Sequence, residues 1–201
     1  MAPNLIPSPN LIPSRSLIPS RSLILVRHPP VAQAWAGRCY GQSDMGLSRQ
    51  GQAMLRALVV ELAALRPDAI LHSDMRRTRA LAQPLARRLG IAPVAAPLWR
   101  ERYFGAWEGR TWDAIYRATG DMMDGMIDDP HGFRPGATGE TTGELVGRIE
   151  QGLAQLPNHA RIVLITHGGP IAAARMVLTG GDIGGLAGLI IPQGTCAELA
   201  I

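Results

Sequence analysis

The chain has 201 residues, of which 46% are hydrophobic and 18% charged, with a formal net charge of +4. This length is typical of one domain, and so much apolar material excludes wholesale disorder. We expect no membrane span, because no run of about 18 uninterrupted apolar residues occurs. The cysteines Cys39 and Cys196 lie outside any CxxC pair, which excludes a zinc ribbon or a disulfide scaffold. All 20 basic residues are arginine, without a cluster interleaved with aromatic residues, so we expect anionic small molecules rather than nucleic acid as partners.

The N-terminal segment is a repeat. The hexapeptides at 5–10, 11–16 and 17–22 read LIPSPN, LIPSRS and LIPSRS. Each copy contains a proline, which removes a donor from a strand ladder, so residues 1–22 are predicted to form an extended or disordered arm. An arm that packs on a partner subunit is the functional alternative. The prolines interrupt any apolar signal-peptide core, which argues against a secretory signal.

Residues 23–201 are predicted to form one domain in which strands and helices alternate. Wholly apolar runs predict buried strands, and apolar residues at three- to four-residue spacing predict helices. Ser48 is placed as an N-cap, Gly90 stops a helix, and Thr141-x-x-Glu144 is a capping box. The expected strands cover 23–26, 69–71, 92–98 and 161–166, the helices 47–65, 75–89, a segment behind Glu144 and 170–178, and a closing β-pair 186–191 and 195–200.

This alternation predicts an α/β fold, namely a three-layer α/β/α domain with a mainly parallel sheet. Residues 102–139 interrupt this alternation of strands and helices and are expected to form a small insertion over the active site. In such sheets, ligands bind at the carboxyl ends of the strands. The residues behind the four strands are Arg27-His28, the run 72–77 with Arg77, the run 99–101 with Glu101, and His167-Gly168-Gly169.

Two histidines, several arginines and a glutamate at one edge of a sheet fit phosphoryl transfer. A neutral imidazole can attack phosphorus and form a phosphohistidine. Arginines and a second histidine can neutralise the charge that develops on the phosphoryl oxygens. A carboxylic acid can protonate the leaving alkoxide and then activate water. Common metal-ligand motifs such as HxH and HExxH are absent from the sequence, so we expect neither a metal nor another cofactor.

Six segments of the chain read LVRH at 25–28, DMGLS at 44–48, SDMRR at 73–77, ERYFGAWEG at 101–109, GET at 139–141 and THGG at 166–169. Together they resemble the histidine phosphatase superfamily, also called the phosphoglycerate-mutase-like family, over about residues 23–180. The resemblance implies that His28 is the phosphorylated nucleophile and that Glu101 is the proton donor. It further implies that the phosphoryl group is bound by Arg27, Arg77, His167 and Gly168.

Two features depart from the family pattern. A Pro-Pro pair follows His28 where the family usually reads glycine and then threonine, so backbone donors to phosphate are missing. Asp74 stands where the family usually has proline, and it is expected to pair with an arginine or to cap the next helix. The RHPPV segment at 27–31 together with CYGQSD at 39–44 resembles a subgroup labelled α-ribazole phosphatase, from cobalamin assembly.

Two further residues compete for these roles. Arg76 precedes Arg77 in the predicted helix, so an error of one residue in register would place Arg76 in the pocket instead. Glu108 is the next candidate for the general acid. The Trp-Glu-Gly turn is expected to place Glu108 beyond the rim, where it would serve the structure.

The expected function is a metal-independent phosphomonoesterase that acts on a small phosphorylated metabolite through a phosphohistidine, with α-ribazole 5′-phosphate as one candidate substrate. A phosphoglycerate mutase is the first alternative, although the chain is short and lacks lysine. A non-catalytic module that binds a phosphate ligand or a phosphoprotein is the second alternative, left open by the Pro-Pro pair. We expect a cytoplasmic location, free thiols being typical of a reducing compartment, and a homodimer as the oligomer to test.

Overall fold

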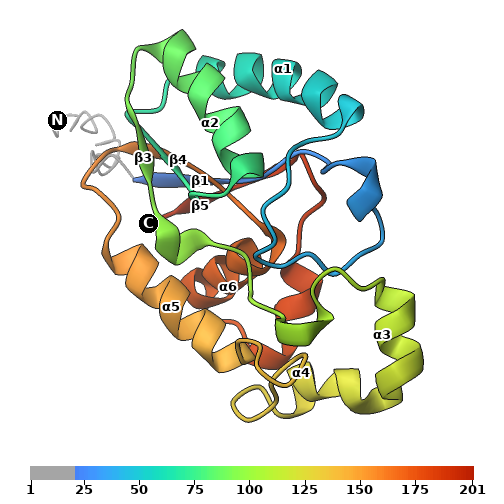
Figure 1. Cartoon of the computed structure of the whole chain (residues 1–201). Helices are drawn as coiled ribbons and strands as arrows, with labels where there is room; N and C mark the ends of the chain where they lie inside the picture. Colours follow the sequence, from blue (N-terminus) through green and yellow to red (C-terminus); the bar gives the residue numbers. More distant parts are fainter. Residues whose placement is uncertain (1–20) are drawn as a thin grey trace, which may run out of the picture.

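The computed structural model describes residues 21–201, which form a five-stranded sheet between two layers of helices (Figure 1). The sheet order is β3-β2-β4-β1-β5; the first four are parallel and β5 is antiparallel to β1. This architecture confirms the predicted α/β fold, whereas the arm predicted over residues 1–22 lies almost entirely outside the described residues. The strands are β1 Ser22–Arg27, β2 Ala69–His72, β3 Pro93–Ala95, β4 Arg161–Thr166 and β5 Cys196–Ala200.

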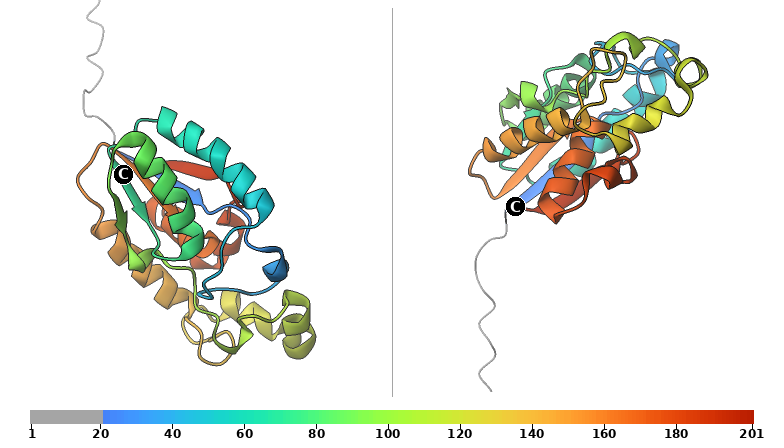
Figure 2. Two further views of the ribbon diagram at one scale, coloured as in Figure 1. Left: turned by 45° about the horizontal axis from the view of Figure 1, so that its top comes forward. Right: turned by 90° about the horizontal axis from the view of Figure 1, so that it is seen from below.

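The helices cover both faces of this sheet. Figure 2 shows α1 and α2 on one side of the strands and α5 and α6 on the other. Within residues 21–201, no helix is both long enough and apolar enough to cross a membrane. The helices are α1 Arg49–Ala64, α2 Arg76–Leu89, α3 Trp112–Thr119, α4 Gly125–Asp128, α5 Thr142–Ala154 and α6 Gly168–Thr179.

The apolar residues of β1 and β4 pack against both layers of helices, with successive residues facing opposite sides of the sheet. Leu23 and Leu25 of β1 pack with the α5–α6 layer, while Ile24 and Val26 pack with the α1–α2 layer. Successive side chains of a strand point to opposite faces, so a strand covered on both sides needs apolar residues at every position. The parallel pairing of β1 with β4 brings Arg27 beside Thr166 at the carboxyl end of the sheet.

Local signals in the sequence placed the helix ends correctly. The hydroxyl of Ser48 accepts from the backbone N–H of Gly51 at the start of α1. Gly90 ends α2 in the left-handed conformation, with φ of 69°, which glycine adopts without strain. Thr141 and Glu144 form the predicted reciprocal capping box at the start of α5.

One predicted strand is longer than observed and another is wrong. The predicted strand 92–98 is confirmed as β3 but covers only three residues, because it is the sheet edge and Pro93 and Pro97, which cannot donate to a ladder, limit it. The segment 186–191 forms no strand; its residues belong mainly to a 3-10 stretch, Ile183–Leu189, that packs on α6. Three glycines in that stretch weaken its tendency to pair as a strand, and β5 pairs with β1 instead.

The segment 102–139 contains α3 and α4, which lie beyond one end of the sheet (Figure 1). A small apolar cluster joins Trp107 and Ile115 of this segment to Cys39, which lies in the loop before α1. Met126 and Ile127 of α4 face the 3-10 stretch Ile183–Leu189 across a cavity. The carboxyl ends of the strands therefore open into a space with walls on two sides.

Candidate active site

His28 follows β1 directly and is fully buried. Its Nδ1 lies 2.8 Å from the carbonyl oxygen of Pro29. Because a carbonyl oxygen can only accept, Nδ1 carries the proton and Nε2 presents its lone pair. Burial, and next the charge of Arg77, lower the pKa of His28 to about 3, so the ring is neutral near pH 7. Proline lacks an N–H but retains the carbonyl that fixes this tautomer.

Nε2 of His28 is buried and has no hydrogen-bond partner among the described residues. The imidazole of His167 lies beside it, with ring centroids 5.2 Å apart. A buried nitrogen without a partner is costly in a purely structural role. An unpaired lone pair on a neutral imidazole is what a nucleophile requires.

His167 caps the start of α6 behind β4, and both of its ring nitrogens are bonded. Nε–H of Arg77 donates to Nδ1 of His167 at 3.1 Å, and Nε2 of His167 lies 2.8 Å from the hydroxyl oxygen of Ser73. Because a guanidinium only donates, Nδ1 of His167 is the acceptor and Nε2 carries the proton. Burial and the charge of Arg77 hold the pKa of His167 well below its ordinary value.

Arg77 is fully buried, whereas Arg76 is exposed, so the predicted register of α2 is correct. Besides its bond to His167, Arg77 donates to the carbonyl oxygens of Ser43 at 2.8 Å and Gly41 at 2.6 Å. Its guanidinium forms no ion pair within the part of the chain that the structure describes. Burial lowers the pKa of Arg77, and a bound anion would compensate this charge.

Arg27, the last residue of β1, points toward the start of α6. One Nη–H donates to the carbonyl oxygen of Ile191 at 2.6 Å, while Nε is buried and unpartnered within residues 21–201. A Cβ on Gly168 would lie 3.1 Å from Cζ of Arg27, so glycine permits this approach. The first backbone N–H groups of a helix attract anions, and here they lie beside a guanidinium.

Glu101 is 8% exposed and lies against the same helix terminus. Its Oε1 accepts from the backbone N–H of Arg102 at 2.9 Å and of Gly169 at 3.2 Å. A Cβ on Gly169 would lie only 2.5 Å from this oxygen, so a side chain there would displace the carboxylate. Both bonds use Oε1, which leaves Oε2 for proton transfer. The structure thus brings Glu101, Arg27, Gly168 and the two histidines to one edge.

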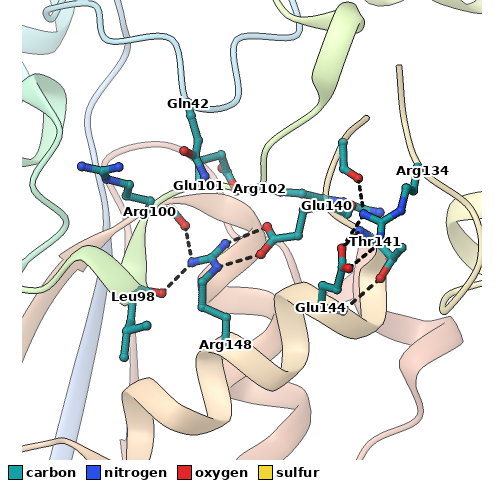
Figure 3. Close-up of polar contacts among 11 residues, drawn as sticks. Gln42, Leu98, Arg100, Glu101, Arg102, Arg134, Glu140, Thr141, Glu144 and Arg148 are labelled. Carbon is teal, nitrogen blue, oxygen red and sulfur yellow. Dashed lines mark hydrogen bonds and ion pairs between the residues drawn. The ribbon is translucent and has the colours of Figure 1, made fainter. Parts of the chain in front are cut away.

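The segment that carries Glu101 is held from α5 (Figure 3). Arg148 donates to the carbonyl oxygens of Leu98 at 2.6 Å and Arg100 at 2.9 Å. The same guanidinium forms a bidentate pair with the carboxylate of Glu140, at 2.8 Å for both bonds. Arg148 therefore fixes the backbone on the N-terminal side of Glu101.

Asp74 pairs with Arg100, as one of its two predicted roles required. It does not cap α2: that role falls to Asp44, whose carboxylate accepts from the backbone N–H of Arg76 at 2.7 Å. The side chain of Arg100 lowers the pKa of Asp74. This pair joins the segments behind β2 and β3.

Glu108 has the structural role that the sequence analysis expected. Its Oε1 accepts from the backbone N–H of Gln42 at 2.9 Å and of Phe104 at 3.2 Å. Its Oε2 accepts from the hydroxyl of Ser43 at 2.9 Å. These bonds hold the loop whose carbonyl oxygens receive the guanidinium of Arg77, so Glu108 acts on the site through that loop.

Arg27, Glu101 and Gly168 form part of the wall of a cavity of about 300 Å³, whereas the buried His28, Arg77 and His167 do not line it. Two of its cationic residues, Arg38 and Arg102, were not predicted as site residues from the sequence. The only signal for Arg102 was its position next to Glu101. The remaining wall is largely apolar and comes from α3, α4, α5 and the 3-10 stretch behind α6.

Comparison with known proteins places this geometry in a family. Residues 23–201 match the histidine phosphatase superfamily (branch 1). The chain is 29% identical over 147 residues to the probable phosphoglycerate mutase GpmB of Erwinia tasmaniensis, covering 72% of this chain and 68% of that protein.

Two solved structures share the fold. A mycobacterial glucosyl-3-phosphoglycerate phosphatase, solved with VO3, superposes with a TM-score of 0.79 and 26% identity, over 90% of this chain and 92% of that one. The α-ribazole phosphatase of Shigella flexneri gives a TM-score of 0.78 at 22% identity over 90% of each chain, which is a likeness of fold. The chain belongs to the histidine phosphatase superfamily (branch 1) and is an enzyme of the histidine phosphatase type.

Proposed function

We propose that this enzyme hydrolyses a small phosphate monoester through a phosphohistidine on His28. The observation that carries the proposal is the buried Nε2 of a neutral His28, which has no partner in the described part of the chain. The guanidiniums of Arg27 and Arg77, which form no ion pair within residues 21–201, supply the positive charge that a phosphoryl group needs.

In the first step, Nε2 of His28 attacks phosphorus and the bond between phosphorus and the ester oxygen breaks. The leaving alkoxide takes a proton from Glu101, which enters this step as the carboxylic acid. Arg27 and Arg77 stabilise the equatorial oxygens, together with the backbone N–H of Gly168 at the start of α6. His167 orients Arg77 through its 3.1 Å bond and neighbours the histidine that receives the phosphoryl group.

In the second step, a water molecule attacks the phosphohistidine. The carboxylate of Glu101 accepts a proton from that water, which regenerates the acid form, and the bond between Nε2 and phosphorus breaks. Inorganic phosphate leaves. Throughout both steps, Nδ1 of His28 keeps its proton and donates it in a hydrogen bond to the carbonyl oxygen of Pro29.

Mutase activity is the second candidate, because relatives at 29% identity are named probable phosphoglycerate mutases. A mutase returns the phosphoryl group to a substrate hydroxyl, whereas a phosphatase gives it to water. The apolar cavity beside Glu101 favours the phosphatase, because phosphoglycerate offers little apolar surface to bury there.

The specific substrate that we propose is α-ribazole 5′-phosphate, because its aromatic base can pack against the apolar wall of the cavity. The proposal also includes a cytoplasmic location, supported by the free thiols of Cys39 and Cys196. A homodimer remains part of the proposal, to be tested by the mass of the protein in solution.

The deciding experiment is rapid-quench trapping with a ³²P-labelled ester in the presence of EDTA. The wild type should accumulate acid-labile, base-stable phosphate, and His28→Ala should accumulate none while retaining its circular dichroism spectrum. Parallel assays with phosphoglycerate should release inorganic phosphate and form no isomer. Full activity in His28→Ala would rule out this mechanism, and isomer formation would favour the mutase.

A further inference from the structure

The cavity beside Glu101 lies where the alcohol portion of the ester must sit, because the acid that protonates the leaving oxygen is part of its wall. Six side chains give most of that wall an apolar character: Trp112, Met126, Ile127, Leu145, Leu186 and Ile190. Walls of this kind stabilise a leaving group with apolar surface. They cannot satisfy a polyol, whose hydroxyls would lose water without gaining partners.

One buried cation interrupts this apolar wall. Arg102 is 6% exposed, and its guanidinium carbon lies 5.6 Å from the ring centroid of Phe104. Its Nε donates to the carbonyl oxygen of Glu140 at 2.8 Å, but Nη2 is buried without a partner among residues 21–201. Burial lowers the pKa of Arg102. An unpartnered buried donor on a cation is costly unless a ligand supplies an acceptor.

The charges around the cavity favour an anionic acceptor. Arg27, Arg38 and Arg102 contribute to the wall, against the single carboxylate of Glu101. Arg27 and Arg77 neutralise the phosphoryl group in the proposed function, whereas the charge of Arg102 is opposed only by carboxylates that do not pair with it, chiefly Glu140 and then Glu101. Arg102 forms no ion pair in the described part of the chain.

We infer that the preferred substrates are phosphate monoesters whose leaving group combines an apolar body with an anionic acceptor, which Nη2 of Arg102 binds. This inference rests on the proposed function and names the substrate class of the same site. A neutral acceptor such as a ribose hydroxyl is bound by the same donor, but less tightly, since charge-assisted hydrogen bonds are about twice as strong. Arg102 is thus a specificity-determining residue.

Three primary alkyl esters test the inference: ethyl phosphate, n-hexyl phosphate and 6-phosphonooxyhexanoate. Their leaving groups are all primary alcohols, so the ratios of kcat/KM report binding of the chain and the carboxylate. We expect at least a tenfold rise from ethyl to hexyl, given about fourfold for each methylene that is fully buried. Adding the carboxylate should give about a further tenfold.

Three variants separate the role of Arg102 from a general loss of charge. In Arg102→Met, the ratio between the carboxylate ester and the hexyl ester should fall below about twofold, and Arg102→Lys should restore part of it. Arg117→Met is the matched control, because Arg117 is an exposed arginine of α3 paired with Asp113. It should retain the whole ratio.

An inhibition measurement on the wild-type enzyme tests the inference even if Arg102→Met does not fold. Hexanoate should inhibit hydrolysis of p-nitrophenyl phosphate at least tenfold more tightly than hexanol. Equal inhibition, equal kcat/KM for all three esters, or an unchanged ratio in a folded Arg102→Met would overturn the inference while leaving the phosphatase proposal intact. If no ester is turned over and no phosphohistidine is trapped, the proposed function fails, and this inference fails with it.

Discussion

Arg77 and His167 are joined by a hydrogen bond of 3.1 Å in which the guanidinium Nε–H is the donor and imidazole Nδ1 the acceptor. The bond links α2 to the residue directly before α6, and it can form only while Nδ1 is unprotonated. His167 therefore acts on the phosphoryl site through the orientation of Arg77, and its own charge state controls that orientation.

Removing this acceptor should damage both activity and stability. In His167→Ala, kcat/KM should fall by about 100-fold or more, because a donor aimed at the developing charge loses its fixed position. The free energy of unfolding should fall by about 1–3 kcal/mol, since a buried guanidinium N–H is left unpaired. Urea unfolding and steady-state kinetics measure the two effects. His167→Asn retains an acceptor oxygen and should recover part of each; no recovery would contradict the positioning role.

The two neutral histidines make stability depend on pH. Burial lowers the pKa of His28 to about 3 and holds the pKa of His167 well below its ordinary value, so below about pH 6.5 the unfolded chain binds protons at both histidines that the folded chain does not, for His28 down to about pH 3. The contribution of these two histidines to the free energy of unfolding is therefore fully present above pH 6.5. It falls as the pH decreases, by up to about 1.4 kcal/mol per pH unit for each histidine. Urea titrations at pH 7, 6 and 5 measure this slope.

The same titrations in His28→Asn isolate one of the two contributions, because carboxylates also titrate in this range. The slope near pH 5 should be smaller than that of the wild type by about 1.4 kcal/mol per pH unit. An identical slope in the variant would mean that the folded state protonates His28 as readily as the unfolded state.

Glu101 should matter in proportion to the basicity of the leaving group. Glu101→Gln should slow alkyl phosphates by at least about 100-fold and p-nitrophenyl phosphate by less than about tenfold, because nitrophenolate leaves without a proton. Measuring kcat/KM for both substrates gives the comparison. Glu108→Gln is the control: it should lower the unfolding midpoint more than it changes this leaving-group dependence. Equal losses on both substrates in Glu101→Gln would show that another group is the acid.

Arg148 should position Glu101 without touching the substrate. Arg148→Met removes the bidentate pair with Glu140 and two bonds to backbone carbonyls, at a cost on the order of 2–3 kcal/mol in stability. Its kcat should fall more for alkyl esters than for p-nitrophenyl phosphate, as in Glu101→Gln but to a smaller degree. Arg148→Lys should recover part of the loss. A drop in stability with no change in leaving-group dependence would leave Arg148 a purely structural residue.

The sequence predicted the parts of the site that depend on strand ends. A wholly apolar run followed by Arg27-His28 or by His167 needs only the rule that ligands bind at the carboxyl ends of parallel strands. The apolar run at 186–191 misled the same reasoning, because an apolar run does not by itself mean a buried strand: only Leu186 of this run is buried, and Ile190 is 44% exposed. Arg102 and Arg148 were missed since their bonds go to backbone carbonyls distant in sequence, for which no spacing rule exists.

The sheet order has a consequence for synthesis of the chain. In the described sheet, strand β1 lies between β4 and β5, which begin at residues 161 and 196. A ribosome makes β1 first, so this apolar strand has both edges unpaired until nearly the whole domain has emerged. Exposed apolar edges invite association between chains, and we expect nascent chains stopped before residue 161 to bind chaperones through residues 22–27. Catalytic competence can arise only after residue 167 has emerged, because His28 remains without its neighbour His167 until then.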